Sequence, residues 1–193
     1  MGLENYVSIR SYITDNRLGS FLKKDASFNG TSEFTDHVLR TKGPRSRDTD
    51  RDLMWCREIH TSCWPSMKTG KFYPFHKKNI RFKAGVQHFD MPVGTRLIEC
   101  NNLNEAKKHF KKDLDVWFSF KRTSKDYKYG DISIYIEDVE HIGLSVDIVC
   151  RKGSNSLKEN TKLVTGFMKE HGVTKIIPHQ VATLVAKALK KAD

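Results

Sequence analysis

The sequence predicts an α+β domain with about eight antiparallel strands and helices packed outside them. Short segments that alternate apolar and polar residues recur along the whole chain. Segments with a helical stripe and N-terminal capping signals lie between groups of these strands. Strand groups separated by helices are typical of α+β folds. The alternation alone leaves open whether the sheet closes into a barrel or packs as a sandwich.

The clearest strand signal lies between residues 131 and 150. Ile132, Ile134 and Ile136 share one face of a strand and place Glu137 on the other. Gly143 follows in a short corner, where the backbone needs freedom that a side chain restricts. A second strand then carries Asp147 out of phase with its apolar neighbours. The other predicted strands cover residues 6–13, 33–40, 53–61, 79–86, 95–100 and 115–123.

Four segments carry helix signals. Asn102 with Glu105, and Ser156 with Glu159, have the spacing of N-terminal caps. The predicted helices begin after residue 15, cover 103–114, run from 157 to Gly172, and run from Pro178 to 191.

Length and composition are those of one soluble domain spanning residues 1–193. The chain is 38% hydrophobic and 30% charged. It contains no apolar run of the roughly 20 residues that a membrane-spanning helix needs. We read no secretory signal at the amino terminus, which predicts a cytoplasmic protein without a membrane partner. Its four widely spaced cysteines predict free thiols. The oligomeric state stays open.

The formal net charge of +11 is spread evenly along the chain. An excess carried by the folded body favours an anionic partner such as a nucleotide, a polyphosphate or RNA. Residues 40–52 contain no apolar side chain and predict an exposed loop. The basic side chains of this loop are Arg40, Lys42, Arg45, Arg47 and Arg51.

The segment around Glu137, the corner from Val139 to Gly143, and Asp147 resembles the CYTH, or triphosphate tunnel, superfamily. This superfamily includes class IV adenylyl cyclases, thiamine triphosphatases and inorganic tripolyphosphatases. The order of elements agrees over most of the chain. The resemblance implies a tunnel-like barrel of about eight antiparallel strands, whose polar lumen holds a triphosphate. It also implies that the last helix closes the barrel.

The resemblance further implies which side chains bind phosphate. In the family, lumen arginines and lysines grip phosphate oxygens, because guanidinium forks match phosphate geometry. The positions here that match are Arg10, Arg57, Arg81, Lys83, Lys121 and Arg122. We predict that Arg10, Arg57, Lys83 and Arg122 point inward, and that Val7, Leu53, Ile80 and Trp117 pack outward under the helices.

One departure concerns catalysis. The family's first strand carries Glu-x-Glu-x-Lys, whereas this chain has Tyr6-Val-Ser-Ile-Arg10 and lacks both glutamates. Glu137 and Asp147 are then the carboxylates left to hold Mg²⁺ or Mn²⁺. The loss also predicts a more cationic lumen. Such a lumen can bind a polyanion tightly without accelerating its chemistry.

Three functions follow. The leading one is binding of a phosphate-rich anion, namely a nucleotide, a polyphosphate or an RNA end, with weak or no catalysis. The second is an active metal-dependent triphosphatase or adenylyl cyclase. The third is an RNA-binding or RNA- and tRNA-processing factor. It would use the basic loop, the lysines of the helix at 103–114, and the aromatic residues among the basic residues 68–78, since aromatic rings stack on bases.

Overall fold

One antiparallel sheet organises the whole chain. The computed structural model describes residues 4–13, 16–41, 52–78, 81–83, 85–91, 97–150 and 154–191. Nine strands form this sheet in the order β4-β3-β2-β7-β8-β9-β1-β6-β5. The strands are β1 (Glu4–Tyr12), β2 (Ser27–Thr41), β3 (Asp52–Thr61), β4 (Phe72–Lys78), β5 (Arg81–Lys83), β6 (Val86–Met91), β7 (Leu114–Tyr129), β8 (Ile132–Val139) and β9 (Gly143–Cys150). The predicted α+β class and antiparallel pairing are confirmed.

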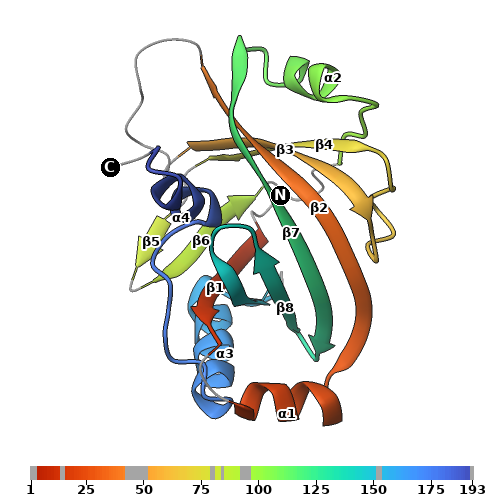
Figure 1. Cartoon of the computed structure of the whole chain (residues 1–193). Helices are drawn as coiled ribbons and strands as arrows, with labels where there is room; N and C mark the ends of the chain where they lie inside the picture. The colour runs from red at the N-terminus through yellow and green to blue at the C-terminus, as the bar shows by residue number, and fades with distance from the viewer. Residues whose placement is uncertain are drawn as a thin grey trace.

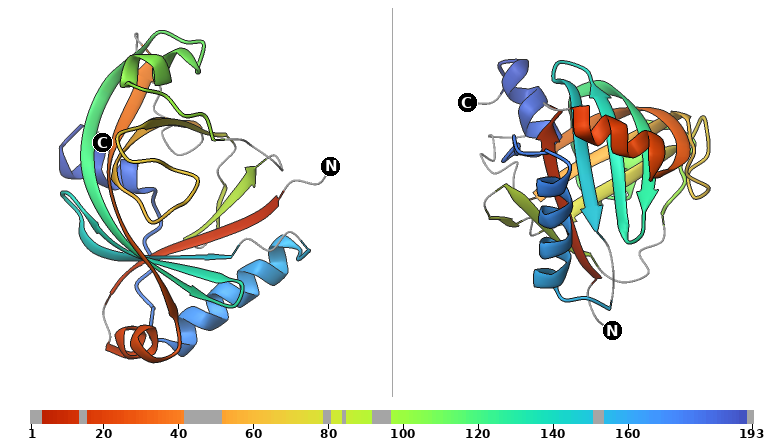
Figure 2. Two further views of the ribbon diagram at one scale, coloured as in Figure 1. Left: turned by 90° about the vertical axis from the view of Figure 1, so that its right-hand side faces the viewer. Right: turned by 90° about the horizontal axis from the view of Figure 1, so that it is seen from below.

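Four helices flank the sheet: α1 (Asn16–Lys24), α2 (Leu103–Lys108), α3 (Leu157–Glu170) and α4 (Val181–Ala188). Figure 1 shows α1 and α3 below β1 and β8, α2 at the far end of β7, and α4 at one end of the sheet. Both views in Figure 2 show the sheet curled around one of its faces. We call this concave face the inner face.

The outer face is covered by helices. Leu18 and Phe21 of α1 and Phe167 of α3 pack against a layer of strand residues that includes Val7 and Ile134. Ala106 of α2 packs on a smaller cluster. Burying these apolar side chains stabilises the sheet and fixes which face of each strand is turned inward, since side chains alternate between faces.

The inner face is apolar at both ends. At one end, α4 packs Val181 and Val185 against strand residues such as Val38 and Phe120. This is the place predicted for the closing helix. At the other end, Phe34, Ile59 and Tyr73 form a buried cluster beside the β3–β4 connection. The polar residues of the inner face lie between these two clusters along β2, β3 and β7.

The sheet differs from the predicted barrel in two respects. In the described residues it has nine strands instead of about eight. Segments 72–78 and 86–91, which the alternation did not predict as separate strands, form β4 and β6, whereas residues 97–99 of the predicted strand 95–100 form none. Its two edge strands are β4 and β5, and no ladder joins them in the described residues. Cα atoms of β4 and β6 come within 8 Å of each other. Pro74 in β4 has no N–H to donate, which is typical of an edge strand.

Several boundaries also differ. The second predicted helix ends at Lys108 instead of residue 114, and β7 extends to Tyr129 instead of 123. Residues 97–99 form no strand, and Cys100 makes only an isolated bridge with Phe72. The four cysteines are free thiols, as predicted. Gly143 has a φ of 84°, which explains the glycine at this corner. In the described residues, no helix has the length and apolar character needed to span a membrane.

Candidate functional site

Three arginine side chains converge on the inner face, each from a different strand. Arg10 lies on β1, Arg57 on β3 and Arg122 on β7. Their side chains are only 4%, 13% and 10% exposed. On β1, successive side chains point to opposite faces of the sheet. Ile9 packs in the apolar layer under α1 and α3, so Arg10 points to the inner face. Buried guanidinium groups need partners for their charge, and three carboxylates supply them.

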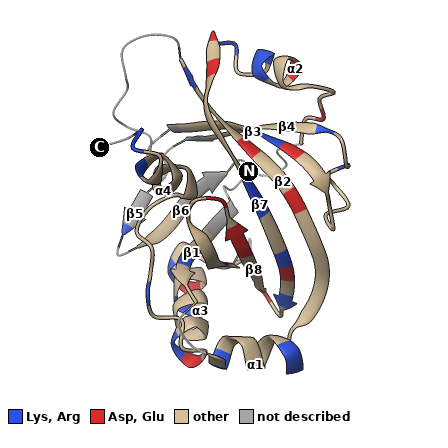
Figure 3. Cartoon of the chain, in the orientation of Figure 1, with Lys and Arg blue, Asp and Glu red and all other residues tan. Residues whose placement is uncertain are grey.

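The arginines and carboxylates form one continuous chain of ion pairs. Arg57 donates to both carboxylate oxygens of Asp36, at 2.8 Å from Nε and 2.9 Å from Nη2. Arg122 donates from Nη1 to Asp36 at 2.9 Å and from Nη2 to Glu137. Figure 3 shows acidic and basic segments beside one another on these central strands.

Arg10 extends the chain to a third carboxylate. Its Nη1 contacts Glu137 Oε2, and its Nη2 lies 3.2 Å from Asp147 Oδ2. Arg10 Nη1 also donates to Ser145 Oγ at 2.9 Å, and Ser8 Oγ donates to Asp147 at 2.6 Å. We call the six charged side chains the inner ion cluster: Arg10, Asp36, Arg57, Arg122, Glu137 and Asp147.

Ion pairing keeps the buried carboxylates charged. Burial alone opposes ionisation of Glu137, but Arg10 and Arg122 outweigh it and hold its pKa at about 2. Burial likewise acts against Asp36, yet Arg57 and Arg122 keep its pKa below the usual value. The same attractions raise the pKa of Arg122 against the effect of its burial. Asp36, Glu137 and Arg122 are therefore ionised at neutral pH.

The cluster contains as many carboxylates as arginines. This corrects the prediction that losing the first-strand glutamates leaves an excess of positive charge, because Asp36 supplies an acid from β2 that the sequence reading missed. The signal was present, since Asp36 is in phase with Phe34 and Val38, all three of which are buried.

Some donor capacity remains unused. Arg122 Nε is buried and has no hydrogen-bond partner among the described residues. Its guanidinium lies 5.0 Å from the Phe34 ring centroid, and that of Arg57 lies 3.8 Å from it. The most exposed members of the cluster are Arg57 at 13% and Asp147 at 18%. These two side chains mark the parts of the cluster that a ligand can reach.

The β3–β4 connection is attached to the inner face through Asp126. This buried carboxylate accepts hydrogen bonds from Trp64 Nε1 and Ser124 Oγ, and it lies 3.5 Å from Cys63 Sγ. Burial raises its pKa despite these donors. Gly30, with a φ of 131°, allows the close approach, because a Cβ there would lie 2.6 Å from that of Cys63. Trp64 therefore joins the β3–β4 connection to the inner face, where it packs against the cluster of Phe34, Ile59 and Tyr73.

The structure separates the predicted phosphate-binding residues. Arg10, Arg57 and Arg122 meet in the inner ion cluster, with Glu137 and Asp147 beside them. Lys83 on β5 and Lys121 on β7 are exposed, and Lys121 lies on the strand face opposite Arg122. The prediction that Lys83 joins the inward group is therefore wrong. The side chain of Arg81 lies outside the described residues.

Of the residues predicted to pack outward, some lie on the outer face and others on the inner face. Val7 packs in the outer cluster under α3, as expected. Leu53 is instead on the inner face, where it packs in the cluster that contains α4, and Trp117 packs against the same cluster. The physical reason is that the inner face is apolar under α4 and polar farther along, so apolar character alone does not identify the outer face. Ile80 lies outside the described residues.

The predicted nucleic-acid surface is described only in part. Arg40 is exposed, with its guanidinium 5.9 Å from the Trp117 ring centroid. Lys42, Arg45, Arg47 and Arg51 lie outside the described residues. Of the aromatic residues proposed to stack on bases, His76 is exposed, whereas Tyr73 is 1% exposed and Phe72 and Phe75 pack against hydrophobic clusters. The latter three anchor β4 to the sheet.

The residues present do not fit the divalent metal that the family resemblance implies. Glu137 and Asp147 both direct a carboxylate oxygen at the guanidinium of Arg10. Asp36 is held by Arg57 and Arg122. A divalent cation placed among these carboxylates would have to displace a guanidinium that already neutralises them. No group of three or more His, Cys, Asp or Glu in the described residues is arranged to hold a metal ion.

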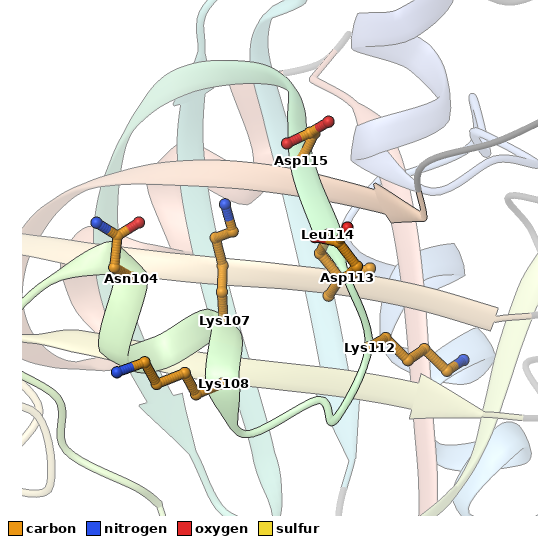
Figure 4. A pocket seen from close by; sticks show the side chains of 7 residues that line it. All are labelled: Asn104, Lys107, Lys108, Lys112, Asp113, Leu114 and Asp115. Atoms are coloured by element: carbon orange, nitrogen blue, oxygen red, sulfur yellow. The ribbon is translucent and has the colours of Figure 1, made fainter.

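A surface hollow of about 480 Å³ lies elsewhere, at α2 and the start of β7 (Figure 4). Lys107, Lys108 and Lys112 line it together with Asp113 and Asp115. Leu114, which also lines it, packs in the smaller hydrophobic cluster that contains Ala106 of α2. The hollow is thus separate from the inner ion cluster, and it contains no buried polar group that would mark a binding site.

Comparison with solved structures places the fold. No protein-family model and no curated protein matches the sequence. The structure is similar to the PH1012 protein of Pyrococcus horikoshii OT3, with a TM-score of 0.70 and 20% identity over 93% of this chain and 98% of that one. It is similar to a proposed adenylate cyclase of Vibrio parahaemolyticus, with a TM-score of 0.68 and 11% identity over 96% and 99%.

A third similar structure is HpAC1 of Hippeastrum, a proposed adenylyl cyclase described as having a dominant triphosphatase activity. Its TM-score is 0.63, with 12% identity over 99% of this chain and 97% of that one. These likenesses cover nearly the whole of each chain and confirm the predicted resemblance at the level of the fold. The chain therefore shares the fold of these structures over nearly its whole length.

Proposed function

We propose that the inner ion cluster binds a phosphate-rich anion, namely a nucleotide, a polyphosphate or an RNA end, with weak or no catalysis. One observation supports this above all. Three arginines from three strands meet in a buried cluster, and the Nε of Arg122 has no hydrogen-bond partner there among the described residues. Guanidinium forks match phosphate oxygens, and burial strengthens each contact.

A phosphate ligand would exchange places with a carboxylate. Asp147 is the most exposed of the three acids, so its side chain is the easiest to turn away from Arg10. Arg57 is the most exposed arginine of the inner ion cluster and keeps donors that Asp36 does not use. A triphosphate carries several negative charges and would replace one carboxylate with a larger gain in attraction.

Little catalysis is expected from this arrangement. The arginines are paired before any ligand arrives, so they contribute to ground-state binding, and uniform binding of that kind does not speed the chemical step. Arg10 and Arg122 also keep Glu137 fully ionised, with a pKa of about 2, so this carboxylate is a poor proton donor near neutral pH.

Thermal unfolding tests the binding. We expect tripolyphosphate, without Mg²⁺, to raise Tm progressively as its concentration increases. At a concentration of 100 times Kd, binding adds about 2.7 kcal/mol to the free energy of unfolding. ATP, a cyclic nucleotide and a 5′-triphosphate RNA complete the panel. Cyclic nucleotides, with a single phosphate charge, should give the smallest shift.

A matched pair of variants locates the site. Arg57→Gln removes a charge from the inner ion cluster while leaving Asp36 paired with Arg122. Lys121→Gln removes one charge from the outside of β7. We expect the first to abolish the ligand-induced shift and the second to leave it unchanged, each measured from its own ligand-free Tm. The proposal would be refuted if both variants lost the ligand-induced increase in Tm equally, or if no polyanion raised the Tm of the unmodified chain.

An active triphosphatase or adenylyl cyclase is the second candidate, favoured by the fold shared with HpAC1. Turnover of tripolyphosphate or ATP near 1 s⁻¹ or faster, about the lower range of working enzymes, would establish it. The activity would also have to be lost on Glu137→Gln or Asp147→Asn. We expect negligible hydrolysis with or without Mg²⁺ or Mn²⁺.

A further inference from the structure

We infer that the guanidinium of Arg10 is a built-in counter-ion that stands where a divalent cation would bind, so that the chain needs no metal to balance Glu137 and Asp147. The inference concerns the same cluster as the proposed function. Its test uses Mn²⁺ alone, so it can fail or succeed independently of phosphate binding.

The argument starts from the atoms around Arg10. Glu137 Oε2, Asp147 Oδ2 and Ser145 Oγ all contact its two terminal nitrogens. Two of these oxygens are carboxylate oxygens and the third is a hydroxyl. Hard oxygen ligands of this kind suit Mg²⁺ and Mn²⁺. The three oxygens come from β8 and β9, so the sheet holds them together without help from Arg10.

The other contacts of the two carboxylates keep them in place. Glu137 uses its Oε1 for Arg122, which leaves Oε2 directed at Arg10. Asp147 accepts at Oδ1 from Ser8 at 2.6 Å, which leaves Oδ2 directed at Arg10. Removing the Arg10 side chain would therefore expose an oriented set of oxygens and two charges that have lost a partner.

With Arg10 present, the same site rejects a cation. The guanidinium fills the space between the oxygens, and its charge repels a second positive ion at this distance. Arg122, on the other side of Glu137, adds to that repulsion. The 4% exposure of Arg10 means that it has little room to swing aside. Arg10 thus sets the specificity of the site against divalent cations.

The test measures Mn²⁺ binding by isothermal titration calorimetry and electron paramagnetic resonance. We expect the unmodified chain to bind no Mn²⁺ in an Asp147-dependent way. Arg10→Ser should bind one Mn²⁺ per chain with a Kd of about 10⁻⁴ to 10⁻³ M, the range of weak oxygen-ligand sites. Adding Asp147→Asn to Arg10→Ser should abolish this binding.

Arg57→Ser is the matched control, since it removes an equal charge from the inner ion cluster but leaves the three oxygens around Arg10 occupied. It should bind no Mn²⁺. Arg10→Gln, which keeps more of the side-chain volume, serves if Arg10→Ser is too unstable to titrate. For either Arg10 variant, a Tm that Mn²⁺ raises counts as support.

Any of three results would overturn the inference. One is a folded Arg10→Ser or Arg10→Gln chain that binds no Mn²⁺ at several times the expected Kd. Another is binding of Mn²⁺ to the unmodified chain that Asp147→Asn removes. Equal Mn²⁺ binding by Arg10→Ser and Arg57→Ser would likewise show that a general loss of positive charge is responsible, and that Arg10 does not mark the site.

Discussion

Asp36 and Arg57 face each other directly across β2 and β3, and the carboxylate of one accepts two hydrogen bonds, at 2.8 and 2.9 Å, from the guanidinium of the other. Arg122, directly across from Phe34 on β7, adds a third hydrogen bond to the same carboxylate at 2.9 Å. A single acid therefore compensates parts of two buried arginines. This makes Asp36 the residue on which the inner ion cluster depends most.

We expect Asp36→Ala to lower the free energy of unfolding by about 3 to 5 kcal/mol, because it leaves buried arginine charge uncompensated. Urea denaturation measures the effect. The control is Glu33→Ala, an exposed acid on the same strand, which should change stability by no more than about 0.5 kcal/mol. A similar small loss in both variants would mean that water reaches the arginines and replaces Asp36.

The low pKa of Glu137 predicts a specific dependence of stability on pH. Its pKa is about 2 in the folded chain, below its usual value of 4.5, which we take for the unfolded chain. The folded state thus binds fewer protons, and Glu137 contributes stability that is complete above pH 4.5 and is lost as pH falls toward 2. The full contribution is roughly 3 kcal/mol. Glu137→Gln should flatten this part of the stability profile, and an unchanged acid slope would contradict the assignment.

Asp126 should titrate in the opposite sense. Burial raises its pKa above the usual value of 3.8, so protonation is easier in the folded chain than in the unfolded chain. Its contribution to stability is therefore present at low pH and fades as pH rises through the raised pKa. Because Trp64 Nε1 donates to this carboxylate, tryptophan fluorescence should change with a midpoint above 3.8. Asp126→Asn and Trp64→Phe should each remove that change; its persistence in either would assign it to another group.

RNA binding, if present, should depend on the basic loop. Each phosphate contact with a single strand contributes a slope of about −0.7 to log affinity against log salt. Reversing Arg45, Arg47 and Arg51 to glutamate should weaken RNA binding and flatten the slope. We expect tripolyphosphate binding to stay nearly intact, since salt would screen loop charges that lie more than a Debye length from the inner ion cluster. Reversing the exposed α3 lysines Lys158, Lys162 and Lys169 is the charge-matched control. Equal effects of the two triple variants would exclude the loop as a specific surface.

The sequence by itself determined the local structure of the strands that build the site. Alternation around Glu137 and Asp147, the corner glycine at 143, and the capping box at Ser156 all act between near neighbours in the chain, and the structure confirms each. The sequence also indicated Arg10, Arg57 and Arg122 as residues of one site, through the resemblance to a known family.

Only the tertiary structure decided how these charges are paired. Asp36 meets Arg122 across 86 positions of sequence, and Arg10 meets Asp147 across 137. Such contacts follow from strand order and register, which the period-two pattern of a single strand does not contain. The pattern also cannot tell which apolar face meets α4, because a curled sheet buries both of its faces. For this reason the sequence pattern did not predict that Leu53 lies on the inner face or that Asp36 lies between two arginines.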